Sequence, residues 1–466
     1  MSSADMANWT YHGTIDLSAI CGSWLTSSRM PSIVSRVEED GLTHFYLYFS
    51  NGDNGIGVIT STSPTGPWTD PLGHALISAS TSGLGLCAHP SDPGAAIDDD
   101  GTGWLAFGCG EPNAEGTDLM PGNARIVRLG KDMISLDSDI VPIPAPYHSG
   151  SNELNVLRGW LAFSYCTSWS ERTDWPSYGT GGNAPSSSSI CYMITNDPLD
   201  PDSWSYKGEY FAKSGLTDFP RSNNHAHLQK YGNSYYLFYH TPWLEQQMDI
   251  TGDYHSVGVN TCNVTEGRRV INPVTQSNTA TLQLANKRPD PFTLQTAETL
   301  CTAAGIQPEA EDGDMFLTVA DGGWIMMKSA YFGNEGIGSF TARLKGKGTL
   351  EVRLDDLEAE PIATIDFAAG DWEESTVACD SMLIGAHDVY LVFTGTEGNA
   401  KLDTWQFTTQ NGTGIQQTDA AEKTPVRNEY YTVSGIRLKE KPASGIVICR
   451  TYYSDGSMKA STITVR

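Results

Sequence analysis

The chain has 466 residues, more than one hydrophobic core usually holds, and its 55 acidic against 29 basic residues give a net charge of −26. Such a surface repels a phosphate backbone, so the composition argues against a nucleic-acid partner. No apolar run has the length of a membrane-spanning helix, and the first ten residues lack the basic and apolar regions of an export signal. The nine cysteines are scattered without zinc-site spacing, so we expect buried thiols with one or two disulfides.

Four strand-like segments share one pattern, at residues 43–51, 102–110, 158–166 and 233–241. Each begins at a turn residue, continues through aromatic and apolar residues, and precedes a loop and a further β-like segment. Similar sheets that recur at intervals of some tens of residues predict a β-propeller, in which each blade packs against its neighbours. A β-sandwich with coincidentally aromatic strands is the alternative.

Polar residues stand ahead of three of these strands. Asp92 precedes the second strand, Glu153 the third, and a group containing Asn224, His225 and His227 the fourth. A propeller brings the ends of its inner strands around one channel, so we expect these side chains to share a site.

The pattern changes after about residue 290. Apolar and polar residues alternate strictly over residues 291–408, which is typical of a β-sandwich. Residues 409–425 are polar and predict a linker, and residues 426–466 predict a small β unit. The sequence therefore predicts an all-β chain with a propeller over residues 1–290, a sandwich, a linker and a β tail.

Four segments, at residues 45–73, 91–108, 152–156 and 223–240, resemble in the same order the motifs of family 43 glycoside hydrolases. That family has five-bladed propellers and acts as β-xylosidases, α-L-arabinofuranosidases and arabinanases. Residues 294–408 resemble a family 6 carbohydrate-binding module, and the tail resembles sorting domains of secreted bacterial proteins. The resemblance implies a secreted or cell-surface protein.

Hydrolysis in that family proceeds with inversion and uses three carboxylates. An acid protonates the leaving oxygen, a base activates water on the opposite face of the sugar, and a third carboxylate orients the acid and raises its pKa. By motif, Glu153 matches the acid and Asp92 the carboxylate that modulates its pKa. Taken alone, each would be an ordinary loop acid or turn residue.

The general base has no counterpart in the sequence. In the family it lies in the first blade, ahead of the segment that residues 3–13 resemble, so we expect the first blade to be incomplete here. Asp5, Asp16 and Asp53 lack the expected context. Self-association could then complete the propeller, because an open ring exposes strand edges.

The resemblance also implies further site residues. The substrate-binding candidates are Arg29, which stands where relatives carry an aromatic residue, Trp104, Asn224, His225 and Arg288. No cofactor is required, but a structural calcium ion is expected, with His225 or His227 at the propeller channel and Glu298 with Asp403 in the module. Trp324 and Trp372 are candidate sugar-stacking residues of the module, where Ser375 and Lys401 depart from the common pattern.

These observations predict a secreted glycosidase that removes arabinofuranosyl or xylosyl units from arabinoxylan or its oligosaccharides. The alternative is a truncated propeller that binds carbohydrate without cleaving it, because the base is not found. A purely structural adhesin fits the tail but leaves the ordered carboxylate motifs unexplained.

Overall fold

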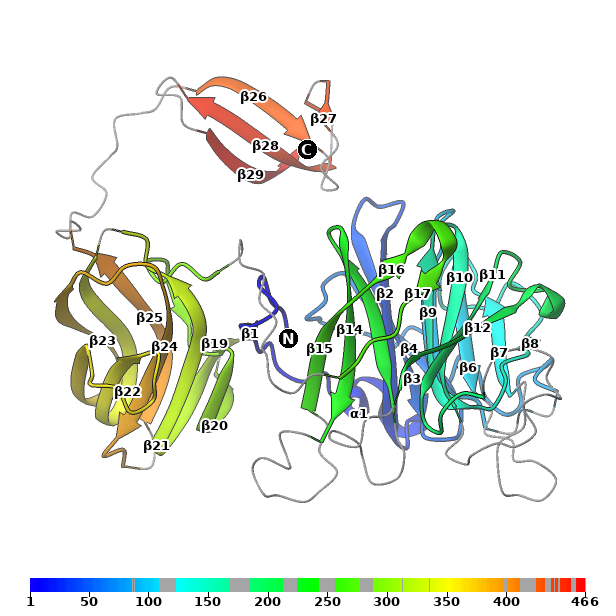
Figure 1. The fold of residues 1–466 in the computed structure, drawn as a ribbon, viewed down its shortest axis with the longest axis horizontal. Helices are drawn as coiled ribbons and strands as arrows, with labels where there is room; N and C mark the ends of the chain where they lie inside the picture. The colour runs from blue at the N-terminus through cyan, green and yellow to red at the C-terminus, as the bar shows by residue number, and fades with distance from the viewer. Residues whose placement is uncertain are drawn as a thin grey trace. The chain divides into compact units, whose positions relative to one another are not determined.

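The computed structural model describes residues 1–85, 87, 89–108, 123–167, 184–212, 224–242, 256–276, 288–311, 313–334, 336–397, 400–410, 425–431, 437–439, 441–442, 445–453 and 458–465. Over these residues the chain is almost entirely β-structure, with one short helix, α1 (Leu17–Cys21), and a few 3₁₀ turns, which confirms the predicted fold class (Figure 1). Two compact units are present, Gly13–Leu282 and a second formed by Met1–His12 with Gln283–Arg466. No helix in the described ranges is long and apolar enough to cross a membrane.

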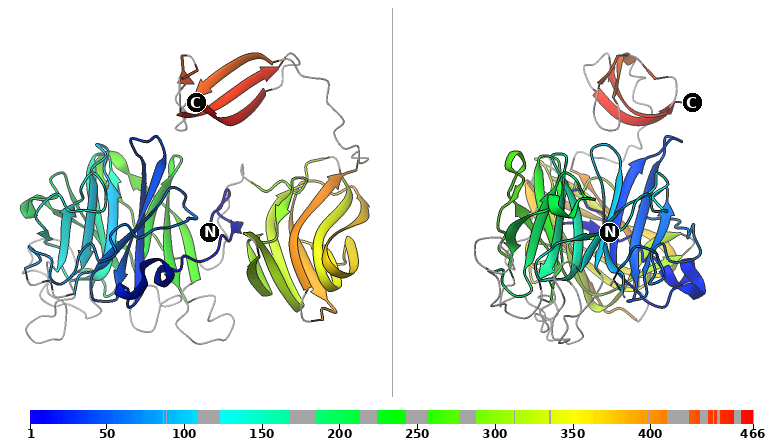
Figure 2. Two further views of the ribbon diagram at one scale, coloured as in Figure 1. Left: turned by 180° about the vertical axis from the view of Figure 1, so that it is seen from behind. Right: turned by 90° about the vertical axis from the view of Figure 1, so that its right-hand side faces the viewer.

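Over its described residues, the unit Gly13–Leu282 contains four antiparallel sheets of three or four strands each, in chain order (Figures 1 and 2). They are formed by β2 (Ser28–Val37), β3 (Thr43–Asn51) and β4 (Ile56–Ser61); β5 (Ser91–Ile97), β6 (Gly103–Gly108), β7 (Ala124–Arg128) and β8 (Val141–Ile143); β9 (His148–Leu157), β10 (Trp160–Thr167), β11 (Ile190–Thr195) and β12 (Ser205–Phe211); and β13 (Ala226–Tyr231), β14 (Ser234–Thr241) and β15 (Ser256–Cys262). The small hairpin of β16 (Val264–Thr265) and β17 (Val270–Ile271) follows. The four repeated segments of the sequence are the second strands β3, β6, β10 and β14.

Neighbouring sheets pack face to face through separate apolar clusters. Tyr48 and Phe107 meet between the first two sheets, Phe163 and Trp104 between the second and third, and Tyr239 packs with residues of the third sheet. Both β6 and β10 therefore have a packed sheet on each face, which explains why their apolar residues run continuously instead of alternating. The first strands β2, β5, β9 and β13 are the inner strands, because each lies beside the first strand of the adjacent sheet.

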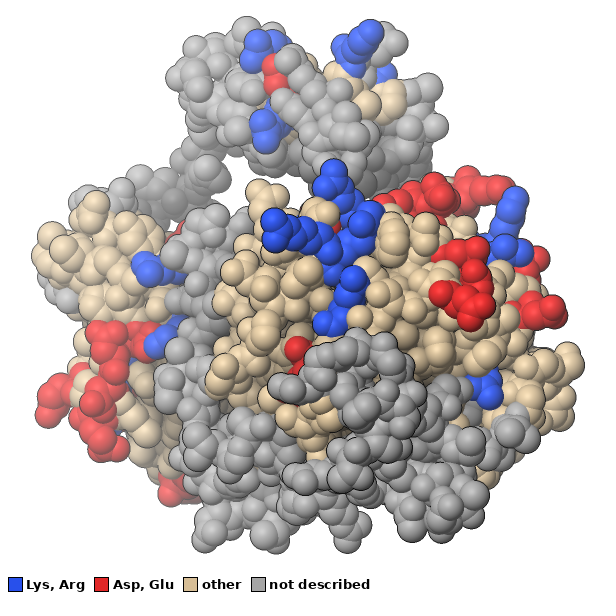
Figure 3. Space-filling model, turned by 45° about the vertical axis from the view of Figure 1, so that its right-hand side comes forward, with Lys and Arg blue, Asp and Glu red and all other residues tan. Residues whose placement is uncertain are grey.

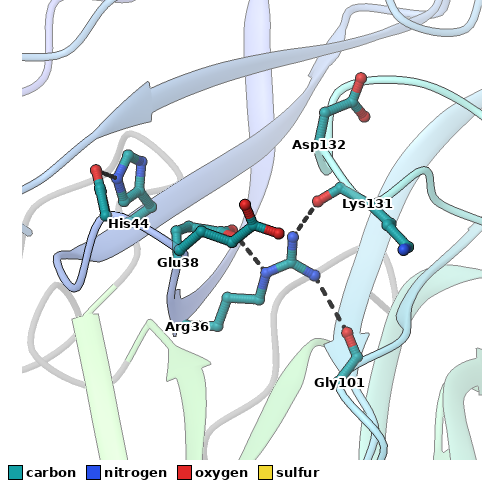
Figure 4. Close-up of a pocket in the computed structure, with 8 residues that line it drawn as sticks. Arg36, Glu38, His44, Gly101, Lys131 and Asp132 are labelled. Atoms are coloured by element: carbon teal, nitrogen blue, oxygen red, sulfur yellow. Dashed lines mark hydrogen bonds and ion pairs between the residues drawn. The ribbon is translucent and has the colours of Figure 1, made fainter.

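An arginine links the first sheet to the turns of the second (Figure 4). Arg36 on β2 donates from Nη1 to the carbonyl of Gly101 at 3.1 Å, from Nη2 to the carbonyl of Lys131, and from Nε to Glu38 Oε1 at 2.6 Å. These residues line an open pocket of about 580 Å³ together with Glu39, Asp40, His44 and Asp132. Charge-assisted bonds to main-chain carbonyls thus join two consecutive sheets of the unit.

The second unit contains a β-sandwich. Its strands are β18 (Gln295–Thr296), β20 (Thr302–Glu311), β21 (Asp314–Tyr331), β22 (Ile337–Leu354), β23 (Ala363–Ser381), β24 (Ala386–Thr394) and β25 (Ala400–Thr409). The long strand β22 pairs with β25 through residues 337–345 and with β24 through residues 349–354, so it passes from one layer to the other. Leu317, Phe340 and Trp405 are among the fully buried residues between the layers.

The first residues of the chain pack on this sandwich, although the sequence analysis placed them with the propeller. β1 (Trp9–Thr10) pairs with β19 (Thr299–Leu300). Asn8 donates from Nδ2 to the carbonyl of Lys328 at 3.0 Å and accepts at Oδ1 from the Lys328 amide at 2.7 Å. The predicted propeller of residues 1–290 thus differs from the compact unit Gly13–Leu282 at both ends.

The tail forms a four-stranded sheet from β26 (Pro425–Tyr431), β27 (Arg437–Leu438), β28 (Gly445–Tyr453) and β29 (Met458–Val465), in the order β27-β26-β28-β29.

Of the cysteines, Cys87 is disulfide-bonded, whereas Cys21, Cys166, Cys191 and Cys262 are buried free thiols. Figure 3 shows groups of lysine and arginine side chains and separate groups of acidic side chains on the face in view.

Candidate active site

Glu153 lies on the inner strand β9 and meets two histidines from the fourth sheet. Its side chain is buried, and its main chain pairs with Ser164 on β10. Glu153 Oε2 is 2.9 Å from His227 Nδ1, and Oε1 is 3.4 Å from His225 Nε2. The polar residues predicted to converge from the third and fourth repeats therefore do so at Glu153.

The contacts set the charges of this pair. Burial raises the pKa of the Glu153 carboxyl, but the charge and hydrogen bonds of the two histidines outweigh it and hold the pKa at about 2. Burial lowers the pKa of His227, but the Glu153 charge outweighs it and raises the pKa to about 9. His227 Nε2 is also bonded to Gln229 Oε1 at 3.2 Å, so both ring nitrogens of an imidazolium have acceptors. Glu153 is thus ionised and the shared proton resides on His227.

Asp92 is held on the neighbouring inner strand, β5, in the left-handed conformation, with φ of +54°. Its amide donates to Ser50 Oγ at 2.8 Å, its carbonyl accepts from Asn152 Nδ2 at 2.8 Å, and its Oδ2 accepts from the Ser151 amide at 3.2 Å. Main-chain and side-chain contacts to the residues just before Glu153 therefore place the two carboxylate-bearing segments side by side.

Two glycines allow this close approach. A Cβ atom on Gly94 would lie 2.8 Å from Glu153 Cα, and one on Gly150 would lie 2.7 Å from Asp92 Oδ2. Gly150 also has φ of +143°, a backbone conformation that residues other than glycine rarely adopt. Both positions favour glycine because any side chain there would push β5 away from β9.

The other substrate-binding candidates have different surroundings. Arg29 is exposed, pairs with Asp53 and lies opposite Ser50, the residue that bonds the Asp92 amide. Asn224 is buried and donates to the carbonyl of Ser188 at 3.0 Å. Arg288 is an exposed residue of the second unit.

The prediction that Trp104 binds substrate is wrong. Its ring is buried in the apolar cluster between the second and third sheets, and its Nε1 donates to Asp98 Oδ2 at 2.8 Å. The ring is therefore part of the core and is not available to stack on a sugar.

The three acids considered as a general base all have other roles. Asp5 packs in the second unit, where Oδ1 accepts from the Asn8 amide at 2.7 Å. Asp16 caps α1 by accepting from the Ala19 amide at 3.0 Å, and Asp53 pairs with Arg29.

The predicted metal residues fit a cation unequally. Among the described residues, no group of three or more His, Cys, Asp or Glu side chains could hold a metal ion, and both His227 nitrogens are engaged. In the module, Glu298 Oε2 is buried without a hydrogen-bond partner within the described part of the chain, and burial followed by the Asp403 charge raises its pKa. That oxygen suits a hard cation. Asp403 suits one less well, because Arg343 already pairs with its carboxylate.

The module's predicted aromatic residues lie on separate parts of the sandwich. Trp372 contacts Phe316 edge to face at 5.4 Å between ring centroids, and Lys401 stands 4.4 Å from the Phe316 centroid. Trp324 packs against Tyr390 at 5.8 Å. Lys401 thus occupies the position next to the Phe316 ring, where an asparagine is common in similar modules.

Comparison with known proteins supports the same assignment. The model of glycosyl hydrolases family 43 matches residues 1–155, and that of carbohydrate binding module family 6 matches residues 296–409. An arabinoxylan arabinofuranohydrolase of Paenibacillus polymyxa is 33% identical over an alignment of 439 residues that covers 88% of this chain and 67% of that protein. The arabinoxylan arabinofuranohydrolase of Bacillus subtilis strain 168 is 32% identical over 439 residues, covering 88% and 82% of the two chains.

The solved structures agree. The crystal structure of a family 43 arabinoxylan arabinofuranohydrolase from Bacillus subtilis in complex with cellotetraose aligns with a TM-score of 0.75 and 30% identity, over 87% of this chain and 86% of that one. Fold and site together define a glycosidase of propeller type with an attached sugar-binding module. The chain belongs to glycosyl hydrolases family 43, and the resemblance seen in the sequence is confirmed.

Proposed function

We propose that the protein releases L-arabinofuranosyl units from arabinoxylan or its oligosaccharides, with inversion at the anomeric carbon. The main support is the similarity to two arabinoxylan arabinofuranohydrolases, which extends over 88% of the chain and so includes both the propeller and the module. Polysaccharide substrates do not enter cells, which supports a secreted or cell-surface location.

In this proposal Glu153 is the general acid and Asp92 modulates its pKa. Glu153 must carry a proton to transfer it to the glycosidic oxygen, and the nearest proton is on His227 Nδ1, 2.9 Å from Oε2. Movement of that proton to Oε2 would leave a neutral histidine and a protonated acid. Asp92, on the adjacent strand, would favour the protonated acid because two neighbouring carboxylates resist joint ionisation.

A second candidate function is carbohydrate binding without hydrolysis. It is favoured because no general base is identified among the described residues. Three acids were considered for this role, and each is engaged elsewhere: Asp5, Asp16 and Asp53. Loss of a general base lowers the rate by about two to four orders of magnitude.

The test is release of arabinose and xylose from arabinoxylan oligosaccharides by the full chain, with the anomeric form of the product followed by proton NMR. Glu153→Gln should abolish release, whereas Glu266→Gln, which removes a surface carboxylate bonded to Tyr235, should not. Binding without release by the parent would support the second function. Predominant xylose release would contradict the proposed specificity.

We further propose that the module binds a structural cation through Glu298, whose buried carboxylate oxygen lacks a partner in the described residues. The Glu298 carboxylate would supply one of several oxygen ligands. Such an ion would stabilise the module and take no part in hydrolysis.

A further inference from the structure

A buried histidine and an asparagine connect β9 to the main chain of Asp92. His148 and Asn152 are each 1% exposed. Asn152 Oδ1 is 2.6 Å from His148 Nε2, and Asn152 Nδ2 donates to the Asp92 carbonyl at 2.8 Å. His148, Asn152 and Asp92 therefore form a continuous chain of hydrogen bonds from the start of β9 to β5.

The hydrogen-bond directions in this chain are fixed. Because the Asn152 amide nitrogen donates to Asp92, its oxygen must be the acceptor for the ring, and His148 Nε2 must carry the proton. Burial lowers the pKa of His148 to about 4, which keeps the ring neutral with Nε2 as its only donor. A reversed Asn152 amide would face the Asp92 carbonyl with an acceptor and lose that bond.

The ring of His148 is itself held in place. It stacks on Phe163 with 6.0 Å between centroids and lies 5.6 Å from Tyr165, whose hydroxyl donates to the carbonyl of Pro146 at 2.9 Å. Packing therefore orients His148, and His148 in turn orients Asn152.

Asp92 needs such support because its backbone is strained. A non-glycine residue with φ of +54° is in a sparsely populated conformation, which persists only where the surroundings impose it. The Asp92 amide is bonded to Ser50 from the first sheet, and its carbonyl to Asn152 from the third. Hydrogen bonds from the neighbouring sheets on both sides thus hold Asp92 in this conformation.

We propose that His148 and Asn152 are positioning residues that fix the Asp92 carboxylate relative to Glu153. The inference rests on the proposed function, since it gives Asp92 its role through the acid. Neither residue needs to touch substrate. Their effect should therefore appear in the step that Glu153 assists and not in substrate affinity.

The experiment compares substrates that differ in their need for an acid. Arabinoxylan oligosaccharides have a poor leaving group that must be protonated, whereas 4-nitrophenyl α-L-arabinofuranoside has one that leaves readily. Asn152→Ala and His148→Leu should lower kcat on the oligosaccharides about 10- to 100-fold with little change in KM, and affect the aryl substrate much less. His148→Gln retains a donor for Asn152 Oδ1 and should restore most of the rate.

Asn155→Ala is the matched control. Asn155 lies on the same strand and also donates to a main-chain carbonyl, that of Leu228 at 2.8 Å, but its bond runs to the fourth sheet. Its loss should affect both substrates alike, and thermal unfolding of every variant separates lost stability from lost positioning. Equal losses on the two substrates for Asn152→Ala, or no rescue by His148→Gln, would overturn the proposal.

Crystal structures of the parent, Asn152→Ala and Asn155→Ala supply a readout that does not depend on turnover. The Asp92 carboxylate should move only in Asn152→Ala, and an unmoved carboxylate refutes the positioning role. If the parent hydrolyses neither substrate, the proposed function fails, and the crystal structures still decide whether His148 and Asn152 hold Asp92.

Discussion

Replacing His227 by asparagine should move the basic limb of the pH–activity profile to lower pH. In the parent, the pair formed by Glu153 and His227 keeps one proton until the pH rises through about 9, the pKa of His227. Without the imidazole, the only proton available to the leaving group is that of Glu153 itself, which is lost at a lower pH. Activity that requires this proton should therefore decline earlier.

The size of the shift follows from the exposure of the pair. One pH unit corresponds to about 1.36 kcal/mol between protonation states. Because 44% of the His227 side chain is exposed, water screens its interaction with the carboxylate. We therefore expect the basic limb to shift by about one to two pH units, less than the rise in the His227 pKa from 6.5 to about 9. In the variant, Asp92 would still raise the pKa of Glu153, and the more it raises this pKa, the smaller the shift of the basic limb.

The assay is kcat/KM for arabinose release from arabinoxylan oligosaccharides between pH 5 and 10, because this constant reports the free enzyme. His44→Asn is the control, since His44 is also bonded to a carboxylate, Asp40 at 2.8 Å, but lies at the pocket of Figure 4. An unchanged basic limb in His227→Asn, or a move to higher pH, would refute the idea that His227 stores the proton.

The remaining predictions concern stability and spacing. In the folded protein the pKa of Glu153 lies below its ordinary value of 4.5, and that of His227 lies above 6.5. The contribution of the pair to stability should therefore be complete between about pH 4.5 and 6.5, and should decline as the pH falls toward 2 or rises through 9. The difference in Tm between the parent and a Glu153→Gln, His227→Asn double variant should follow this window. Gly150→Ala places a Cβ 2.7 Å from Asp92 Oδ2 and should lower kcat for the oligosaccharides while the module's binding of xylan oligosaccharides, measured by calorimetry, stays unchanged. Calcium at 100 times its Kd should stabilise the module by about 2.7 kcal/mol and so raise its unfolding temperature. A chelator should reverse this rise, and Glu298→Gln should abolish it. An unfolding temperature of the parent that changes with neither calcium nor chelator would contradict the cation site.

The strand repeats and the convergence on Glu153 could be predicted from the sequence. Strands packed on both faces are rich in consecutive aromatic and apolar residues, so β6 and β10 stand out without any partner being known, and β3 and β14 share their residue pattern. The same property explains the error at Trp104. Where both faces of a strand are buried, alternation no longer distinguishes a core ring from one that faces a channel.

The positioning contacts could not be predicted in the same way. Ser50 and Asn152 act through backbone groups of Asp92, 42 and 60 residues distant in the chain, and hydrogen bonds of this kind leave no periodic pattern. His148 was missed for a related reason. A buried histidine beside two aromatic residues has the local surroundings of an ordinary core position.

The pairing of β1 with β19 has a consequence for synthesis on the ribosome. Asn8 bonds to Lys328, 320 residues away, and the whole unit Gly13–Leu282 is encoded between them. At about 5 to 20 residues per second, roughly 15 to 60 seconds pass before the partner of Trp9 and Thr10 emerges. The first strand of the sandwich unit is therefore synthesised first and gains its partner β19 late, so a propeller that folds as it emerges does so before β1 can pair with β19.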